Sequence, residues 1–139
     1  MATPQLDAVV FQLTDAITAG RFDQSAAVLA DLLHMGEAPI KLLSVLGRQL
    51  RQLYSARLAL EARKGTGYLM ELWGMKSDYP ARKLLDAARR FDLAWCRAAV
   101  TAAAQADLAM KSQSGADGEE LLIDLLLELA NRPPKAGIA

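Results

Sequence analysis

Leucine and alanine recur along this chain at helical spacing, and glycine or proline interrupts them at intervals that fit individual helices. Apolar residues at positions i, i+3, i+4 and i+7 fall on one face of an α-helix. Hydrophobic residues make up 53% of the sequence, whereas aromatic residues make up only 6%. Leucine and alanine favour helices, and the β-branched residues that favour strands are few. The sequence therefore predicts an all-α fold.

Glycine, proline and aspartate mark the ends of the predicted helices. Glycine suits the left-handed position after a helix, and Gly20 and Gly36 directly follow apolar helical stretches. Proline fits a first helical turn, where we expect Pro39. Aspartate caps the free amides of a helix start, the role that we predict for Asp7 and Asp92. The resulting helices, about seven in all, cover residues 7–20, 23–35, 39–63, 68–73, 77–90, 93–111 and 119–131.

The length of 139 residues is usual for one domain, and no internal repeat divides the chain. We expect a single helical bundle over residues 7–131. Residues 1–6 are predicted to form a leader. Residues 132–139, which begin just before a pair of prolines, are predicted to form a flexible tail.

The last predicted helix is apolar on almost every side, because seven of its residues are leucine or isoleucine and only Asp124 and Glu128 interrupt its middle. A helix on the surface of a soluble protein shows one apolar stripe. This helix is therefore either buried in the core or covered on its outer face by another chain.

Charge is distributed in three blocks, although the net charge of the chain is zero. Residues 1–40 carry a net charge of −4, residues 41–97 carry +7, and residues 98–139 carry −3. Such a chain either neutralises itself on folding or presents its basic middle to a polyanion, and charge alone does not decide between the two.

The residues that usually build catalytic or metal sites are scarce. Cys96 is the single cysteine and His34 the single histidine, so we predict no disulfide, metal site or Ser-His-Asp triad. Residues 64–67, Lys-Gly-Thr-Gly, are glycine-rich, but no strand precedes them, and we interpret them as a linker instead of a nucleotide cradle. We expect no cofactor and no enzyme activity from these residues. Cys96 is interpreted as a small buried apolar residue.

The sequence also lacks targeting and membrane signals. Its first ten residues have neither the basic start nor the apolar core of a signal peptide, and no run of 18 apolar residues occurs. We therefore expect a cytoplasmic protein that does not enter a membrane.

Residues 68–90 allow a second interpretation, because a short helix, a turn with Gly74 and a basic helix have the outline of a helix-turn-helix. In that motif the second helix enters the major groove of DNA, where Arg82 and Arg89 would contact phosphates or bases. A DNA-binding regulator is therefore the alternative function. Three aromatic residues of this region are interpreted as packing residues: Tyr68, Trp73 and Tyr79.

Four segments, in order, resemble the C-terminal domain (domain III) of the delta subunit of the bacterial DNA polymerase III clamp loader. The first is the Phe-x-Leu-x-Asp-Ala-Ile start at 11–17, and the second is Gly36-Glu37 with Pro39, leading into Arg48, Gln49, Arg51 and Leu53. The third is the stretch at 75–92, which contains a Tyr-Pro turn and an Ala-Arg-Arg-Phe run. The fourth is the pair Asp107 and Lys111, and together the resemblance covers about residues 7–130.

This resemblance implies a part of a larger assembly. In the family, the domain joins its counterparts in the delta-prime and gamma or tau subunits to form a circular collar, close to primer–template DNA. Two AAA+ type domains precede it, and one of them engages the sliding clamp. The resemblance thus implies a non-catalytic oligomerisation domain within the machinery of a DNA-directed DNA polymerase.

The resemblance also suggests which residues make contacts. It accounts for the apolar last helix as a subunit interface, for which the candidates are Leu121, Leu122, Leu125 and Leu129. It also accounts for the basic middle as a surface that attracts DNA phosphates, for which the candidates are Arg48, Arg51, Arg82 and Arg89.

Overall fold

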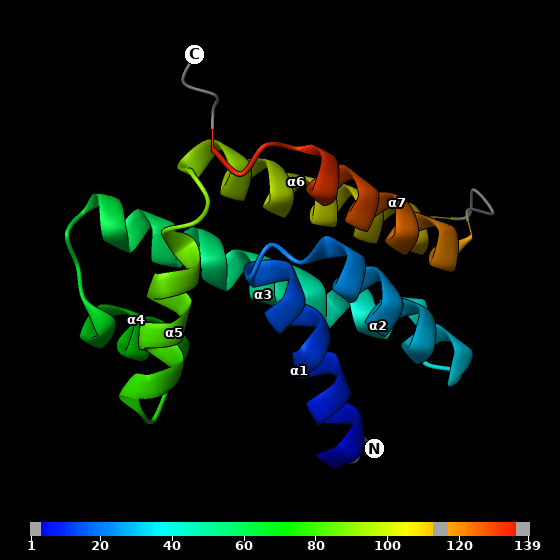
Figure 1. Ribbon diagram of the computed structural model, residues 1–139, viewed down its shortest axis with the longest axis horizontal. Coiled ribbons are helices and arrows are strands. Elements are labelled where there is room, and N and C mark those ends of the chain that lie inside the picture. Colours follow the sequence, from blue (N-terminus) through cyan, green and yellow to red (C-terminus); the bar gives the residue numbers. More distant parts are fainter. Residues whose placement is uncertain (1–3, 113–116, 136–139) are drawn as a thin grey trace.

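Helix α3 (Pro39–Glu61) runs through the middle of the molecule and contacts helices on several sides (Figure 1). Its 23 residues span roughly 35 Å at 1.5 Å per residue. Leucines at helical spacing form its apolar face, and Leu43, Leu46, Leu50 and Leu53 are all buried. The computed structural model describes residues 4–112 and 117–135, and leaves out the side chains of 4–8 and 10.

Seven helices and no strand lie within those described ranges, which confirms the all-α prediction. Helices α1 (Pro4–Thr18) and α2 (Phe22–His34) form an N-terminal hairpin. Helices α4 (Thr66–Trp73) and α5 (Asp78–Ala88) pack together against α3. Helices α6 (Leu93–Lys111) and α7 (Gly118–Asn131) complete the bundle, α6 making the most extensive contact with α3. None of the helices in the described ranges is long and apolar enough to cross a membrane.

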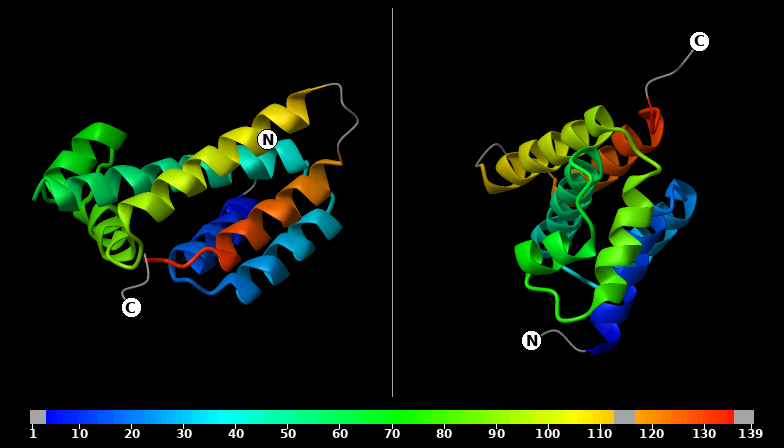
Figure 2. Two further views of the ribbon diagram at one scale, coloured as in Figure 1. Left: turned by 90° about the horizontal axis from the view of Figure 1, so that it is seen from above. Right: turned by 90° about the vertical axis from the view of Figure 1, so that its left-hand side faces the viewer.

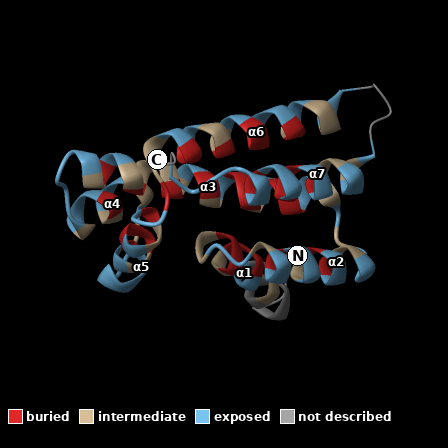
Figure 3. Ribbon diagram, turned by 45° about the horizontal axis from the view of Figure 1, so that its top comes forward, coloured by how far each residue is buried: buried red, intermediate tan, exposed pale blue. Residues whose placement is uncertain are grey.

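The helix directions bring the second and the last helix of the chain together. In Figure 2, α6 runs opposite to α3 and α7 runs opposite to α6, which lays α7 beside α2. Figure 3 shows that buried residues lie on the sides where the helices face one another. One buried cluster extends from Leu13 in α1 to Leu129 in α7, so the described helices share a single hydrophobic core.

Most predicted helix ends are confirmed by the backbone. Gly20, Gly36 and Gly74 have φ angles of +76°, +88° and +66°, the left-handed conformation that glycine adopts without strain. The Asp92 carboxylate accepts a hydrogen bond from the N–H of Trp95 at 2.8 Å, as expected of an N-cap.

The start of the first helix is different from the prediction. Helix α1 begins at Pro4, so Asp7 lies inside the helix instead of capping it, and three residues of the predicted leader are helical. Proline fits a first helical turn, which gives this earlier start a local reason. At the other end, the carbonyl of Pro134 accepts a hydrogen bond from the N–H of Asp92 at 2.9 Å, and residues 136–139 of the predicted tail lie outside the described residues.

Candidate subunit interface

Helix α7 divides its apolar residues between the core and the surface. Leu122, Leu125 and Leu129 are between 0% and 3% exposed, so this chain itself buries three of the four leucines predicted for a subunit interface. Leu121 is half-buried. By contrast, Ile123 is 47% exposed and Leu127 is 55% exposed. The exposed apolar surface of α7 is therefore centred on Ile123 and Leu127, and the three buried leucines hold the helix in place.

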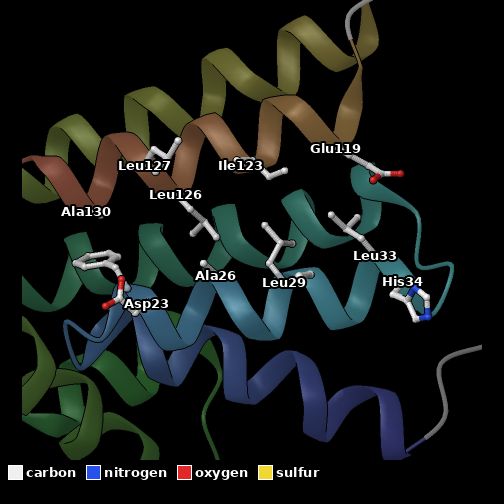
Figure 4. A pocket seen from close by; sticks show the side chains of 12 residues that line it. Asp23, Ala26, Leu29, Leu33, His34, Glu119, Ile123, Leu126, Leu127 and Ala130 are labelled. Carbon is white, nitrogen blue, oxygen red and sulfur yellow. The ribbon is translucent and has the colours of Figure 1, made fainter.

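An apolar groove of about 740 Å³ lies between α2 and α7. The two helices run in opposite directions along it, and Figure 4 shows Leu29 and Leu126 pointing toward one another at its floor. Both of these leucines are almost completely buried. The residues that line the groove are Phe22, Asp23, Ala26, Leu29, Ala30, Leu33, His34, Glu119, Ile123, Leu126, Leu127 and Ala130.

Charged and polar side chains stand only at the ends of this groove. Asp23 is at one end, and His34 and Glu119 are at the other, as the close view in Figure 4 shows. Small-molecule sites usually combine an apolar wall with several convergent polar groups that orient the ligand. Because the middle of the groove lacks such groups, its chemistry fits an apolar surface of another macromolecule better than a substrate.

A second, smaller cleft of about 200 Å³ joins three of the segments that carried the family resemblance. Lys83 of α5 donates to the Asp15 carboxylate of α1 at 2.8 Å, and its ammonium lies 4.7 Å from the ring centroid of Phe11. The side chains of Lys83 and Asp15 are each 39% exposed, so solvent screens the pair and its contribution to stability is small. These motif residues connect the N-terminal hairpin to α5 within the chain.

Two of the four arginines predicted to contact DNA phosphates, Arg48 and Arg51, lie on α3. The other two are Arg82 on α5 and Arg89 at the C-cap of α5. All four side chains are exposed. Arg82 forms an ion pair with Asp78 at 2.7 Å, and Arg89 pairs with Asp86. Acidic neighbours thus partly neutralise the outer face of α5, whereas Arg48 and Arg51 form no ion pair within the described part of the chain.

Hydrogen bonds also join α4 to the first turn of α5. The Thr66 hydroxyl and the Arg82 guanidinium bond to the Asp78 carboxylate and hold its pKa below the usual value. The packing role predicted for three aromatic residues is confirmed only for Trp73, which is half-buried and donates from its indole nitrogen to the Ser55 hydroxyl at 2.8 Å. Tyr68 and Tyr79 are 45% and 65% exposed, so their predicted packing role is wrong.

The single cysteine and the single histidine, residue types that are common in catalytic sites, lie on different helices. Cys96 is buried in α6, as expected, and burial raises the pKa of its thiol to about 12. A thiol with that pKa is protonated at neutral pH and is a poor nucleophile. His34 lies at the exposed end of α2. Within residues 4–112 and 117–135, no group of three or more His, Cys, Asp or Glu residues is arranged to hold a metal ion.

Comparison with known proteins decides what this arrangement of helices is. The family model described as DNA polymerase III delta subunit, C-terminal domain, matches residues 7–128 of the chain. The chain belongs to this family. No curated protein is significantly similar in sequence to the chain. The Asp107–Lys111 pair, the last of the four resembling segments, forms an ion pair at 2.9 Å in this family member.

A solved structure supports the same assignment. The chain is similar to the Bacillus subtilis DNA clamp loader delta protein (YqeN), with a TM-score of 0.78 and 25% sequence identity. The similarity covers 89% of this chain and 36% of that protein. The delta-family domain described here therefore spans about a third of the length of that structural relative. Neither comparison favours the helix-turn-helix alternative.

The sequence predicted a subunit interface on α7, but three of the four leucines that it named are buried within this chain. Leu122 and Ile123 are adjacent, and the apolar pattern of α7 is too continuous to separate the face that packs on α3 and α6 from the face that borders α2. One feature of the sequence could have indicated that α2 also lines the groove: the small apolar residues Ala26 and Ala30 lie four positions apart.

Proposed function

We propose that this chain is a non-catalytic oligomerisation domain of a clamp-loader delta subunit, and that it helps to assemble the loader in the cytoplasm. The observation that carries the proposal is the exposed apolar groove between α2 and α7, found in a chain that belongs to the delta family. Exposed contiguous apolar surface on a soluble domain usually marks a site of protein association. The neighbouring delta-prime and gamma or tau type subunits are the proposed partners, with primer–template DNA nearby and the sliding clamp bound elsewhere in the delta subunit.

Substitution on the exposed face of α7 tests this proposal. A delta subunit that carries Leu127→Asp is expected to lose at least tenfold in the amount co-purified with the other loader subunits, because a carboxylate would have to be desolvated in the interface. The control is Leu108→Asp on α6, since Leu108 is 71% exposed and lies outside the groove. Circular dichroism would show that both variants remain helical. Normal assembly of a folded Leu127→Asp subunit would contradict the proposal.

A further inference from the structure

Helices α2 and α7 carry acidic side chains around an apolar centre. Within their described residues, the two helices contain six acidic residues and neither lysine nor arginine. The acidic residues are Asp23, Asp31, Glu119, Glu120, Asp124 and Glu128. The folded chain therefore brings together the two acidic blocks of the sequence, which are far apart in residue number, and lays an apolar groove between them.

The position of these acids relative to the groove follows from helical geometry. Ile123 and Leu127 line the groove, and Asp124 and Glu128 each follow one of them by a single residue, about 100° further around α7. Both carboxylates are exposed. On α2, Asp23 lines the groove and Asp31 is exposed beyond Ala30. Exposed carboxylates thus lie on both helices beside the apolar centre of the groove, and one of them, Glu128, is paired with Arg132 at 3.9 Å.

This pattern selects one class of partner. We infer that the α2–α7 groove binds an amphipathic α-helix of a neighbouring protein subunit, which inserts an apolar stripe between α2 and α7 and places lysine or arginine on both sides of that stripe. Opposite charges at the rim of an interface orient the partner and favour it over others. The same carboxylates repel nucleic acid and anionic lipid, whose surfaces are negatively charged.

The dimensions of the groove fit such a helix. The lining of α2 extends from Phe22 to His34, roughly 18 Å or about three helical turns. A helix of that length presents about three apolar anchors, at i, i+3 or i+4, and i+7, as helices bound in grooves commonly do. Two of the lining residues on α2, Ala26 and Ala30, are small, which lets another helix approach closely.

The described C-terminal segment of this chain does not fill the groove. Residues after α7 lead to the start of α6, where the Pro134 carbonyl accepts the hydrogen bond from Asp92. The proposed occupant is a segment of another protein. This inference rests on the proposed function, and it adds the chemical character of the partner segment.

Peptide binding to the whole chain tests the inference. The probe is a fluorescent helical peptide of about 14 residues with leucines at i, i+4 and i+7 and lysines on both sides of them. A matched peptide carries glutamate in place of each lysine. Fluorescence anisotropy is expected to show binding of the basic peptide that is at least tenfold tighter than binding of the acidic one, and that weakens as salt is added.

Charge reversal on the protein locates the site. The double variant Asp31→Lys and Asp124→Lys is expected to weaken binding of the basic peptide by about tenfold, whereas Glu71→Lys combined with Asp86→Lys, on α4 and α5, leaves it unchanged. Leu127→Asp is expected to abolish binding. Any of three results would overturn the inference. The two peptides could bind with equal affinity, the two double variants could have equal effects, or anionic vesicles or DNA could bind at Leu127. If one of those results is found but Leu127→Asp still loses loader assembly, the inference about the partner fails and the proposed function stands.

Discussion

Arg57 shows how one charged side chain connects two helices at the residue scale. Its guanidinium donates to the carbonyl of Phe91 at 3.3 Å and, at the limit of hydrogen-bonding distance, to the carbonyl of Ala88 at 3.5 Å. It also pairs with Glu61 at 3.0 Å on its own helix. The Ala88 carbonyl, at the end of α5, also accepts from the N–H of Phe91, so the main acceptor that Arg57 of α3 satisfies is the Phe91 carbonyl, between α5 and α6.

Replacing Arg57 with methionine is expected to lower the free energy of unfolding by about 1–3 kcal/mol, because the Phe91 carbonyl loses the guanidinium as its donor. Urea denaturation followed by circular dichroism measures the change. Arg51→Met serves as the control, since Arg51 is exposed on the same helix, and its effect is expected to stay within about 0.5 kcal/mol. Equal losses in the two variants would show that the bonds from Arg57 contribute nothing specific.

At the scale of the element, the start of α6 depends on one polar residue, Asp92, that lies between two buried aromatic residues. Phe91 and Trp95 are stacked with their ring centroids 4.0 Å apart. Between them, the Asp92 carboxylate caps the Trp95 amide. The cap fixes where α6 begins, and the stacked rings hold that beginning in the core. Local sequence and tertiary packing therefore specify the same helix start.

The variant Asp92→Ala is expected to destabilise the domain by about 1 kcal/mol, since the Trp95 amide loses its acceptor. Asp92→Asn keeps a side-chain oxygen at the same position and is expected to cost only a few tenths of a kcal/mol. Thermal unfolding of the two variants measured side by side separates the cap from the negative charge. A loss in Asp92→Asn as large as that in Asp92→Ala would assign the effect to charge instead.

For the whole molecule, the contact between α3 and α6 is the central one, because the other helices gather around this pair. Helix α3 supplies large leucines, whereas α6 supplies small buried residues at helical spacing, among them Ala99, Ala102, Ala103 and Ala106. Large side chains on one helix and small ones on the other allow close packing over a long contact. The central pair is thus built from complementary residue sizes.

Enlarging one of these alanines is expected to disturb the whole bundle. Ala103→Leu should lower the free energy of unfolding by about 1–3 kcal/mol, because the extra carbon atoms have no space at a fully packed contact. Ala104→Leu adds the same atoms at the adjacent exposed position and should change stability by less than about 0.5 kcal/mol. Chemical denaturation compares the two. A neutral Ala103→Leu variant would mean that the α3–α6 contact is loosely packed.

Local signals determined the helices of this protein. Helices are set by signals that act within a few residues. Here these are the spacing of leucine and alanine, the N-cap Asp92, and the glycines at 20, 36 and 74 that end helices. The order of four short segments, again read from the sequence, indicated the family. The start of α1 was placed too late, since the helix-starting proline at position 4 was taken as part of a leader.

Only the tertiary structure decided which residues face outward. Helix α7 is apolar around most of its circumference, so its own sequence leaves the choice between Leu125 and Leu127 to the helices packed against it. The acidic residues of α2 and α7 likewise come together because these helices, almost 100 residues apart, run side by side in opposite directions. Periodicity describes one helix at a time, whereas a groove is a property of two helices and of the core that fixes their separation.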